Sequence, residues 1–113
     1  MRKDGQVDYI ELPAPDIAAA KRFYGAVCGW TFEDYGPDYC AFKDGRLDGG
    51  FRADAAPAGT QPVVVLFAHD LDAFEKKVAA TGAAILEHHV FPGGRRFHFR
   101  DPNGNVLAVW SDK

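Results

Sequence analysis

The chain repeats one order of predicted elements twice, and this repeat constrains its fold more than any other feature. In each half an alternating strand leads to an aspartate that is placed to cap a helix, and three strands follow. The two capping aspartates, Asp16 and Asp70, lie 54 residues apart. A unit of four strands and one helix leaves one sheet face uncovered, and stacking two units buries it. We therefore expect an α+β chain of two tandem βαβββ modules, which form a curved, roughly eight-stranded cup with two main outer helices.

The predicted elements follow the same order in both halves. The first module covers about residues 5–53, and its elements are a strand at 7–12, a helix at 17–29 and strands at 30–35, 39–44 and 47–53. The second covers about 63–111, and its elements are a strand at 63–70, a helix at 71–81 and strands at 83–91, 95–101 and 105–111. The stretch 54–62, rich in Ala, Gly and Pro, is predicted to be a linker. With 113 residues the chain is expected to form a single domain, 1–113.

Hydrophobic periodicity assigns side chains to faces. The apolar face of the first helix is predicted to hold Ile17, Ala20, Phe23, Tyr24 and Val27. Strand alternation places one set toward the helices, namely Ile10, Leu12, Val64, Leu66, Leu107 and Val109. The other set is Tyr9, Glu11, Val63, Val65, Phe67, Val106, Ala108 and Trp110. This second face is the candidate binding surface.

Composition excludes several classes of function. The formal net charge is −3 and the basic residues are mostly scattered, so we do not expect nucleic acid as a partner. The N-terminus has no long apolar run, which predicts neither a signal peptide nor a membrane span, and therefore a cytoplasmic protein. Cys28 and Cys40 are expected to be free and partly buried. No CxxC, HExxH, GxSxG, P-loop or GxGxxG motif occurs.

Several short motifs resemble those of one family. They are "DIxxAxxFY" after the first strand, "GW" after the first helix and "DPNGN" before the last strand. With the doubled module, they resemble the glyoxalase/bleomycin-resistance/extradiol-dioxygenase superfamily, also called vicinal oxygen chelate proteins. The segments "IELPAPD" and "DPNGNVLAVW" are most similar to the branch of small proteins related to lactoylglutathione lyase. The resemblance covers nearly the whole chain and implies a cup that holds a divalent metal on four strand positions, usually in a dimer.

The metal positions implied by the resemblance carry unsuitable residues here. Three of them correspond to Tyr9, Val63 and Ala108, and the fourth falls within 48–51, in a register that the sequence leaves open. Valine and alanine have no lone pairs to offer a cation, and a catalytic zinc site usually needs three protein ligands. We therefore expect no metal cofactor, and no metal-assisted isomerisation of the kind that glyoxalase I performs.

Glu11 and Tyr9 are candidates in the first module. By strand parity Glu11 lies beside Tyr9, where a carboxylate on a partly apolar wall could abstract a proton α to a carbonyl. The alternative is a glutamate in water at the mouth of the cup, or one paired with an arginine. Tyr9 could hydrogen-bond a ligand carbonyl or phosphate, or its hydroxyl could bond a backbone group in the core.

The second module offers histidines and arginines. If Gly93 and Gly94 form a two-residue turn, His89 lies opposite His98 on one face, and the resemblance also sends His98 into the cup. His98 could act as an acid/base or contact an anion, or could be a half-exposed strand residue. Arg96 and Arg100 share its parity; they could form a positive rim for a carboxylate or phosphate, or could solubilise a sheet edge.

Three functions remain open. The first is a metal-free module that binds a small organic ligand through Tyr9 and Arg96, the aromatic rings of Phe67 and Trp110, and the apolar Val63 and Ala108. The second is a metal-independent lyase or isomerase in which Glu11 or His98 moves a proton. The third is a glyoxalase with substitute ligands, for which the candidates are Glu11, His89 and His98. The expected partners are a small molecule and a second copy of the chain in a homodimer.

Overall fold

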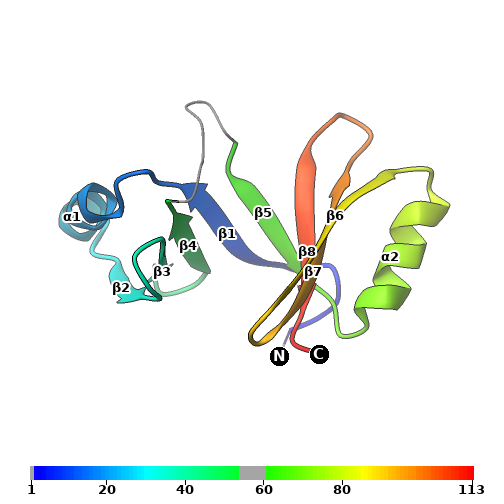
Figure 1. Cartoon of the computed structure of the whole chain (residues 1–113), viewed down its shortest axis with the longest axis horizontal. Helices are drawn as coiled ribbons and strands as arrows, with labels where there is room; N and C mark the ends of the chain where they lie inside the picture. Colours follow the sequence, from blue (N-terminus) through cyan, green and yellow to red (C-terminus); the bar gives the residue numbers. More distant parts are fainter. Residues whose placement is uncertain (1, 54–60) are drawn as a thin grey trace. The chain divides into compact units, whose positions relative to one another are not determined.

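The computed structural model describes residues 2–53 and 61–113, and their elements follow the predicted order (Figure 1). The chain divides into two compact units, which we call module 1 (Tyr9–Val63) and module 2 (Met1–Asp8 with Val64–Lys113). Most of the predicted linker, residues 54–60, lies outside the described residues. The fold class is confirmed, because the chain is α+β and each half has the order strand, helix and three strands.

Module 1 is built on the sheet order β2-β3-β4-β1. Its elements are β1 (Val7–Pro13), α1 (Ile17–Cys28), β2 (Thr31–Asp34), β3 (Tyr39–Lys43) and β4 (Asp48–Arg52). β1 pairs with β4 in parallel, with Glu11 opposite Gly50, and the other pairs are antiparallel. The register of the fourth strand, which the sequence left open, is thereby fixed.

Module 2 repeats this pattern with the sheet order β5-β8-β7-β6. Its elements are β5 (Val63–Phe67), α2 (Leu71–Ala80), β6 (Ala84–Phe91), β7 (Gly94–Arg100) and β8 (Val106–Ser111). β5 pairs with β8 in parallel, and β8-β7-β6 form an antiparallel meander alongside α2 (Figure 1). The N-terminal segment joins the module through two hydrogen bonds. The amide of Gly5 donates to the carbonyl of Phe67, and the amide of Phe67 donates to the carbonyl of Gln6.

Both helices begin at the predicted caps. The Asp16 carboxylate accepts from the Ala19 amide at 3.0 Å, and the Asp70 carboxylate accepts from the Ala73 amide at 3.0 Å. α1 ends at Gly29, whose positive φ of 72° suits a residue without a side chain. The predicted apolar face of α1 is only partly correct, because Phe23 is 56% exposed and Val27 is 65% exposed. These two residues lie away from the line along which α1 meets the sheet.

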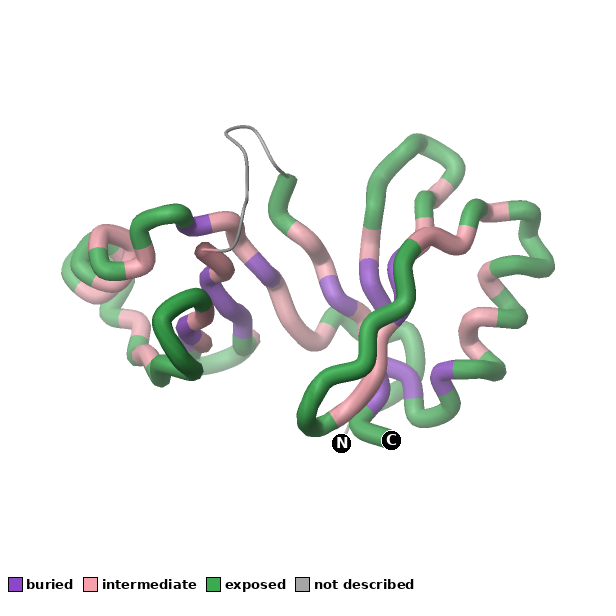
Figure 2. The backbone as a smooth tube through the Cα atoms, viewed as in Figure 1, coloured by how far each residue is buried: buried purple, intermediate pink, exposed green. Residues whose placement is uncertain are grey.

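Each module has its own core (Figure 2). In module 1, Phe42 and Phe51 pack against Leu12, Tyr24 and Trp30, and the Trp30 ring stacks on Phe42 with centroids 4.4 Å apart. In module 2, the buried core residues are Ala68, Leu71, Phe97 and Val109. Residues of the predicted helix-side set contribute to both cores, so the alternation of the strands is confirmed.

The two cysteines lie in different surroundings. Both are free, but Cys40 is buried in the module 1 core whereas Cys28, at the end of α1, is exposed. The expected partial burial of Cys28 is therefore wrong, because Cys28 is the last residue of α1 and is exposed.

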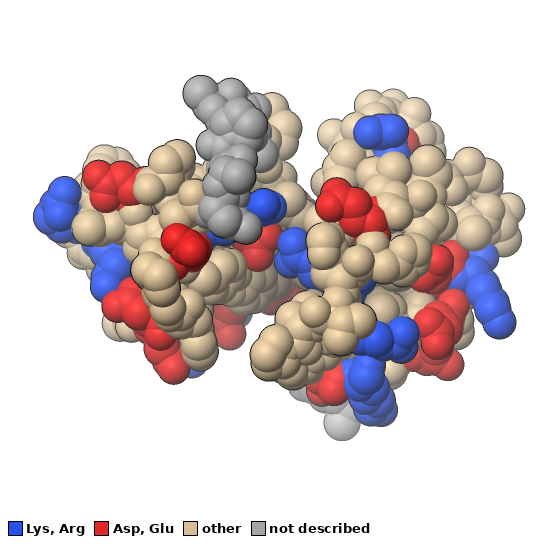
Figure 3. Space-filling view, viewed as in Figure 1, with Lys and Arg blue, Asp and Glu red and all other residues tan. Residues whose placement is uncertain are grey.

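The face of the molecule shown in Figure 3 carries charges of both signs. Acidic and basic side chains are interspersed on the face shown in Figure 3. Among the described residues, neither helix has the length and apolar character needed to cross a membrane.

The Asp16 cap should contribute measurably to stability. We expect Asp16→Ala to lower the free energy of unfolding by about 1 kcal/mol, because the Ala19 amide loses its acceptor. Urea denaturation followed by circular dichroism measures this. Asp16→Asn is the matched control, since an asparagine oxygen also caps a helix. Equal stability of the alanine variant and the unchanged protein would contradict the assignment.

Candidate functional site

Module 1 carries a polar face on the side of its sheet away from α1. The register brings together residues from β1, β3 and β4, and we call these residues the module 1 face: Tyr9, Glu11, Tyr39, Ala41, Asp48, Gly50 and Arg52. Glu11 lies on β1, with Gly50 on the neighbouring strand β4 directly beside it and Ala41 on β3 one strand further. The smallest side chains therefore lie next to the carboxylate.

Hydrogen bonds connect the polar residues of this face. The hydroxyls of Tyr9 and Tyr39 lie 2.6 Å apart, and the Tyr39 hydroxyl donates to Glu11 Oε2 at 3.1 Å. On its other oxygen, Glu11 faces the guanidinium of Arg52, with Nη1 3.7 Å from Oε1. Glu11 is only 6% exposed, so its charge is met by a cation and a phenol in place of water.

Gly50 makes room for this network. A Cβ atom at Gly50 would overlap the Tyr39 hydroxyl and would lie 2.6 Å from the Tyr9 hydroxyl. A side chain at this position is thus incompatible with the observed tyrosine pair, and the glycine is required by close packing.

Burial and negative neighbours raise the pKa of both tyrosines. For Tyr39 the largest cause is desolvation, followed by its hydrogen bond with Tyr9 and the charge of Glu11. For Tyr9 desolvation again raises the pKa, as do the charges of Glu11 and Asp48, whereas the hydrogen bond with Tyr39 lowers it. Both phenols therefore keep their protons at neutral pH and act as hydroxyl groups.

Module 2 carries a second face of different chemistry. The β7–β8 register sets Arg96 opposite Trp110 and His98 opposite Ala108, and the β6–β7 register sets His89 opposite Arg96. We call His89, Arg96, His98, Ala108 and Trp110 the module 2 face. It combines a guanidinium and two imidazoles with an indole ring. His98 and Ala108 are buried, and Arg96 and Trp110 are partly exposed.

The hairpin that carries the histidines differs from the prediction. Phe91 pairs with Gly94, so the two-residue loop is Pro92-Gly93, and His89 lies opposite Arg96 and not opposite His98. The two histidines still share a face, with ring centroids 5.4 Å apart. Of the two glycines, Gly93 has the positive φ of 99° in the loop, whereas Gly94 does not have a positive φ and begins β7. An irregularity between Ile85 and His88 then shifts the register beside His98.

The aromatic residues of module 2 are held by the N-terminal segment. The Trp110 indole N–H donates to Asp8 Oδ2 at 2.8 Å, and the Arg2 guanidinium lies 4.9 Å from the Phe67 ring centre and 5.3 Å from that of Trp110. Phe67 itself is 2% exposed and meets Trp110 edge-on. Phe67 therefore supports the Trp110 ring from within the core.

The remaining predicted residues are separate from these contacts. Val63 lies half-buried at the start of β5, and Arg100 lies exposed at the end of β7, opposite Val106. His69 bonds the N-terminal segment through its amide to Asp4 and its ring to the Arg2 carbonyl.

At three of the four implied metal positions the residues do not fit a metal ion. Tyr9 offers a phenol that keeps its proton and is hydrogen-bonded to Tyr39. Val63 and Ala108 offer only hydrocarbon. Within residues 2–53 and 61–113, no group of three or more His, Cys, Asp or Glu side chains is arranged to hold a metal. These three positions therefore do not supply the ligands that a hard or borderline cation needs.

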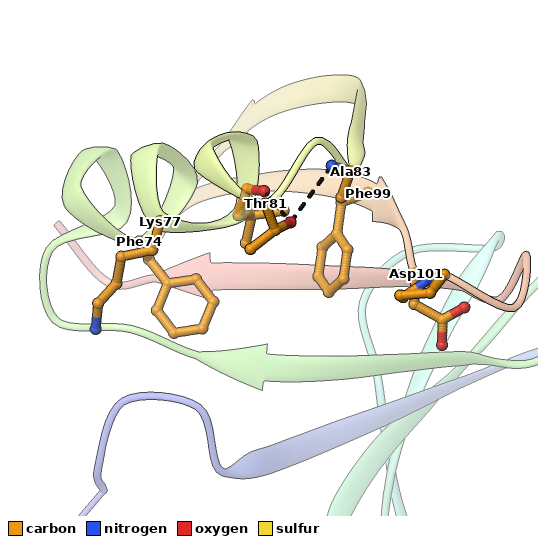
Figure 4. A pocket seen from close by; sticks show the side chains of 8 residues that line it. Phe74, Lys77, Thr81, Ala83, Phe99 and Asp101 are labelled. Atoms are coloured by element: carbon orange, nitrogen blue, oxygen red, sulfur yellow. Dashed lines mark hydrogen bonds between the residues drawn. The ribbon is translucent and has the colours of Figure 1, made fainter.

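An apolar pocket of about 300 Å³ lies on the helix side of module 2 (Figure 4). It lies where the end of α2 approaches the end of β7, and its lining residues are Phe74, Lys77, Val78, Thr81, Ala83, Phe99, Asp101 and Pro102. None of the predicted site residues lines it. Most of its exposed lining is carbon, and the polar residues at it are Lys77, Thr81 and Asp101.

The two residues of the module 1 face that contact the Glu11 carboxylate were missed from the sequence. Tyr39 and Arg52 lie 28 and 41 residues from Glu11 in the chain, and only the pairing of β3, β4 and β1 brings them to it. The one available signal was the glycine pair at 49–50, because glycine inside a strand indicates close approach of another group.

Comparison with known proteins gives a consistent result. The sequence model of the Glyoxalase/Bleomycin resistance protein/Dioxygenase superfamily matches residues 6–109. The chain is 29% identical to the anthracycline biosynthesis protein DauV of Streptomyces sp. strain C5, over 94% of this chain and 46% of DauV. It is 25% identical to the putative glyoxylase CFP32 of Mycobacterium bovis, over 96% of this chain and 46% of CFP32. The chain thus spans about half the length of these curated relatives.

A solved structure shows the same fold. It is a glyoxalase/bleomycin resistance protein/dioxygenase superfamily member from Vibrio splendidus 12B01, which superposes with a TM-score of 0.70 at 18% identity. The match covers 94% of this chain and 97% of the other.

The raised pKa values of Tyr9 and Tyr39 predict a loss of stability at alkaline pH. A phenol in the unfolded chain ionises near pH 10, whereas in the folded chain these two keep their protons above that pH. Below pH 10 both phenols are protonated in the folded and in the unfolded chain, so their contribution to the free energy of unfolding is fully present. Above it only the unfolded chain releases protons, so the free energy of unfolding falls as pH rises.

Urea unfolding at pH 8 and pH 11 measures this effect. Tyr39→Phe should lose less stability between the two pH values than the unchanged protein. Asp16→Ala, which removes no tyrosine, is the control and should lose as much as the unchanged protein. The same loss in Tyr39→Phe as in the control would show that the Tyr39 pKa is not raised.

Proposed function

Because the chain belongs to the glyoxalase/bleomycin resistance protein/dioxygenase superfamily, we propose that it is a member that binds a small organic ligand without a metal ion. The observation that carries this proposal is the composition of the two polar faces. Three of the four implied metal positions hold a hydrogen-bonded phenol and two hydrocarbon side chains, while a guanidinium, imidazoles and hydroxyls occupy neighbouring positions. Such groups recognise organic functional groups by hydrogen bonds and charge.

The module 2 face favours a flat ligand with an anionic group. Arg96 lies beside Trp110 across the β7–β8 pair, so a ring stacked on the indole would bring a carboxylate or phosphate within reach of the guanidinium. His89 and His98 add hydrogen-bond donors or acceptors on the same face. The relative DauV is named for anthracycline biosynthesis, which also favours a flat polycyclic compound as the ligand class.

A second candidate function is proton transfer by a lyase or isomerase. Glu11 is buried, and a phenol and a guanidinium lie against its carboxylate, as in sites where a carboxylate moves a proton next to a carbonyl. His98 is the alternative group for this role. The name of the relative CFP32, a putative glyoxylase, is consistent with this chemistry.

Isothermal titration with 2-naphthoate, a flat aromatic carboxylate, tests ligand binding at module 2. We expect binding by the metal-free protein and a loss of affinity of about tenfold in Arg96→Gln, because a charge-assisted hydrogen bond is removed. Arg95→Gln is the matched control, since Arg95 lies on the opposite face and contacts Asp72. Equal weakening in both variants, or no binding by the unchanged protein, would contradict the proposal.

Exchange of α-protons in D₂O tests the second candidate. With phenylpyruvate as the probe, a catalytic Glu11 would remove a methylene proton to give the enol and return a deuteron to the same carbon. Proton NMR should then show exchange that is lost in Glu11→Gln but kept in Glu33→Gln, whose carboxylate is exposed on β2. Exchange no faster than in buffer would exclude this role for the probe class.

A further inference from the structure

The Arg2 side chain lies on an aromatic surface of module 2. Its guanidinium is over the Phe67 ring, 4.9 Å from the ring centre, and over the Trp110 ring, 5.3 Å from the centre. Asp8 Oδ1 lies 3.6 Å from Arg2 Nε, and Asp8 Oδ2 accepts from the Trp110 indole N–H at 2.8 Å. The carboxylate is thereby held beside the rings. We call Asp8, Phe67 and Trp110 the cation site, because aromatic faces and a carboxylate bind planar cations.

The segment that carries Arg2 is anchored by bonds that do not use the Arg2 side chain. The Gly5 amide donates to the Phe67 carbonyl, and the His69 amide donates to the Asp4 carboxylate. The His69 ring donates to the backbone carbonyl of Arg2 at 3.1 Å. The Arg2 side chain itself is 48% exposed, and at such a position an ion pair or a cation–π contact changes an affinity by only about two- to fivefold. It can therefore leave the rings while the segment stays in place.

We propose that the cation site binds a planar cationic group of the ligand, a guanidinium or an amidinium, and that the Arg2 side chain fills this site until the ligand displaces it. The inference rests on the proposed function, that the module 2 face binds a small organic ligand, and it adds a second charged group to that ligand. The Arg2 guanidinium shows that a planar cation fits over the rings beside Asp8. A ligand stacked on this side of Trp110 needs the position that Arg2 occupies, so binding and displacement are coupled.

Asp8 makes the site selective for a cation. Its side chain is only 22% exposed, so the carboxylate has lost most of its contact with water. When Arg2 leaves, the indole N–H of Trp110 remains as a donor, but the negative charge loses its cation. A partly buried charge is costly without a partner, and a cationic group of the ligand replaces that partner. A neutral group of the same shape does not.

The cation site lies in one row with Arg96. Phe67 pairs with Trp110 across β5 and β8, and Trp110 pairs with Arg96 across β8 and β7. Neighbouring strands are about 4.8 Å apart, so the two ends of the row are separated by about 10 Å. The row therefore favours a flat molecule with a planar cation at one end and a carboxylate or phosphate at the other.

Removal of the Arg2 side chain tests the cation site. Arg2→Ala leaves the volume of the guanidinium open over the two rings, and methylguanidinium is the probe. We expect millimolar, saturable binding, seen by NMR as a shift of the Trp110 indole N–H signal. N-methylurea has the same shape without the charge and should bind about tenfold more weakly. The Trp30 indole signal should stay unchanged, because Trp30 lies in the core of module 1.

Two further variants are the controls. Lys3→Ala keeps Arg2 in place and should bind methylguanidinium no better than the unchanged protein does. Asp8→Asn, added to Arg2→Ala, keeps an acceptor for the indole N–H but removes the charge, so the preference over N-methylurea should disappear. No saturable shift in folded Arg2→Ala, or equal binding of the two probes to it, would overturn the inference.

Displacement is tested in the unchanged protein with 4-guanidinobenzoate, which has a planar cation and a carboxylate at opposite ends of one ring. The ring currents of Phe67 and Trp110 shift the Arg2 Nε–H and Hδ signals in the free protein. At saturation these signals should move to the positions of an unstructured arginine. Arg2→Ala should bind the compound about fivefold more tightly, since no side chain has to leave. Arg2 signals that stay in place at saturation, or equal affinities, would overturn displacement.

The two proposals fail in different ways. Binding of 2-naphthoate through Arg96, with no binding of methylguanidinium to Arg2→Ala, would overturn this inference and leave the proposed function standing. If neither 2-naphthoate nor 4-guanidinobenzoate bound the unchanged protein, the proposed function and the displacement of Arg2 would both be overturned.

Discussion

A buried carboxylate constrains the first module more than any other group. Glu11 is almost completely removed from water, and an ionised carboxylate in such a position is costly unless donors surround it. Arg52 and Tyr39 supply the donors, and both come from strands that reach Glu11 only through the sheet pairing. Gly50 is required beside it because the tyrosine hydroxyls occupy the space of a side chain. Strand order, glycine placement and polar chemistry are therefore linked through one side chain.

The two modules share an order of elements and differ in the chemistry of their open faces. In module 1, an acid and two phenols form a hydrogen-bonded chain, whereas in module 2 a guanidinium, two imidazoles and an indole share neighbouring positions. The apolar faces are alike, because each buries aromatic and aliphatic residues between sheet and helix. The two modules therefore have similar apolar side chains on the face that packs against the helix, and different functional groups on the opposite face.

Local signals predicted the elements well, because they depend on neighbours in the chain. Asp16 and Asp70 cap their helices as expected, and Asp101 accepts from the amides of Asn103 and Asn105 in the predicted turn. Errors arose where two local solutions compete. Gly93 and Gly94 allow a hairpin loop one residue later than the observed Pro92-Gly93 loop, and that shift moves His89 from His98 to Arg96. Phe23 fits the helical spacing but lies outside the contact with the sheet.

The candidate site was predictable only in part, for a related reason. Strand parity placed Glu11 beside Tyr9 and Arg96 with His98, since alternation is a property of one strand. Strand parity could not predict the contacts of Tyr39 and Arg52 with Glu11, because these depend on which strands pair and in what register. Nor could it show that Phe67 is covered and that Asp8 and Arg2 hold the Trp110 ring.

The central claim is that this member of the superfamily works without a metal ion, and metal content tests it most directly. Untagged protein would be assayed for bound metal as purified, after chelation, and after reloading with zinc, nickel, manganese or iron, with thermal stability followed at each step. A metal that binds the folded chain must stabilise it. The account predicts far less than one metal ion per chain and an unchanged melting temperature throughout. Near-stoichiometric metal with a matching gain in melting temperature would contradict it.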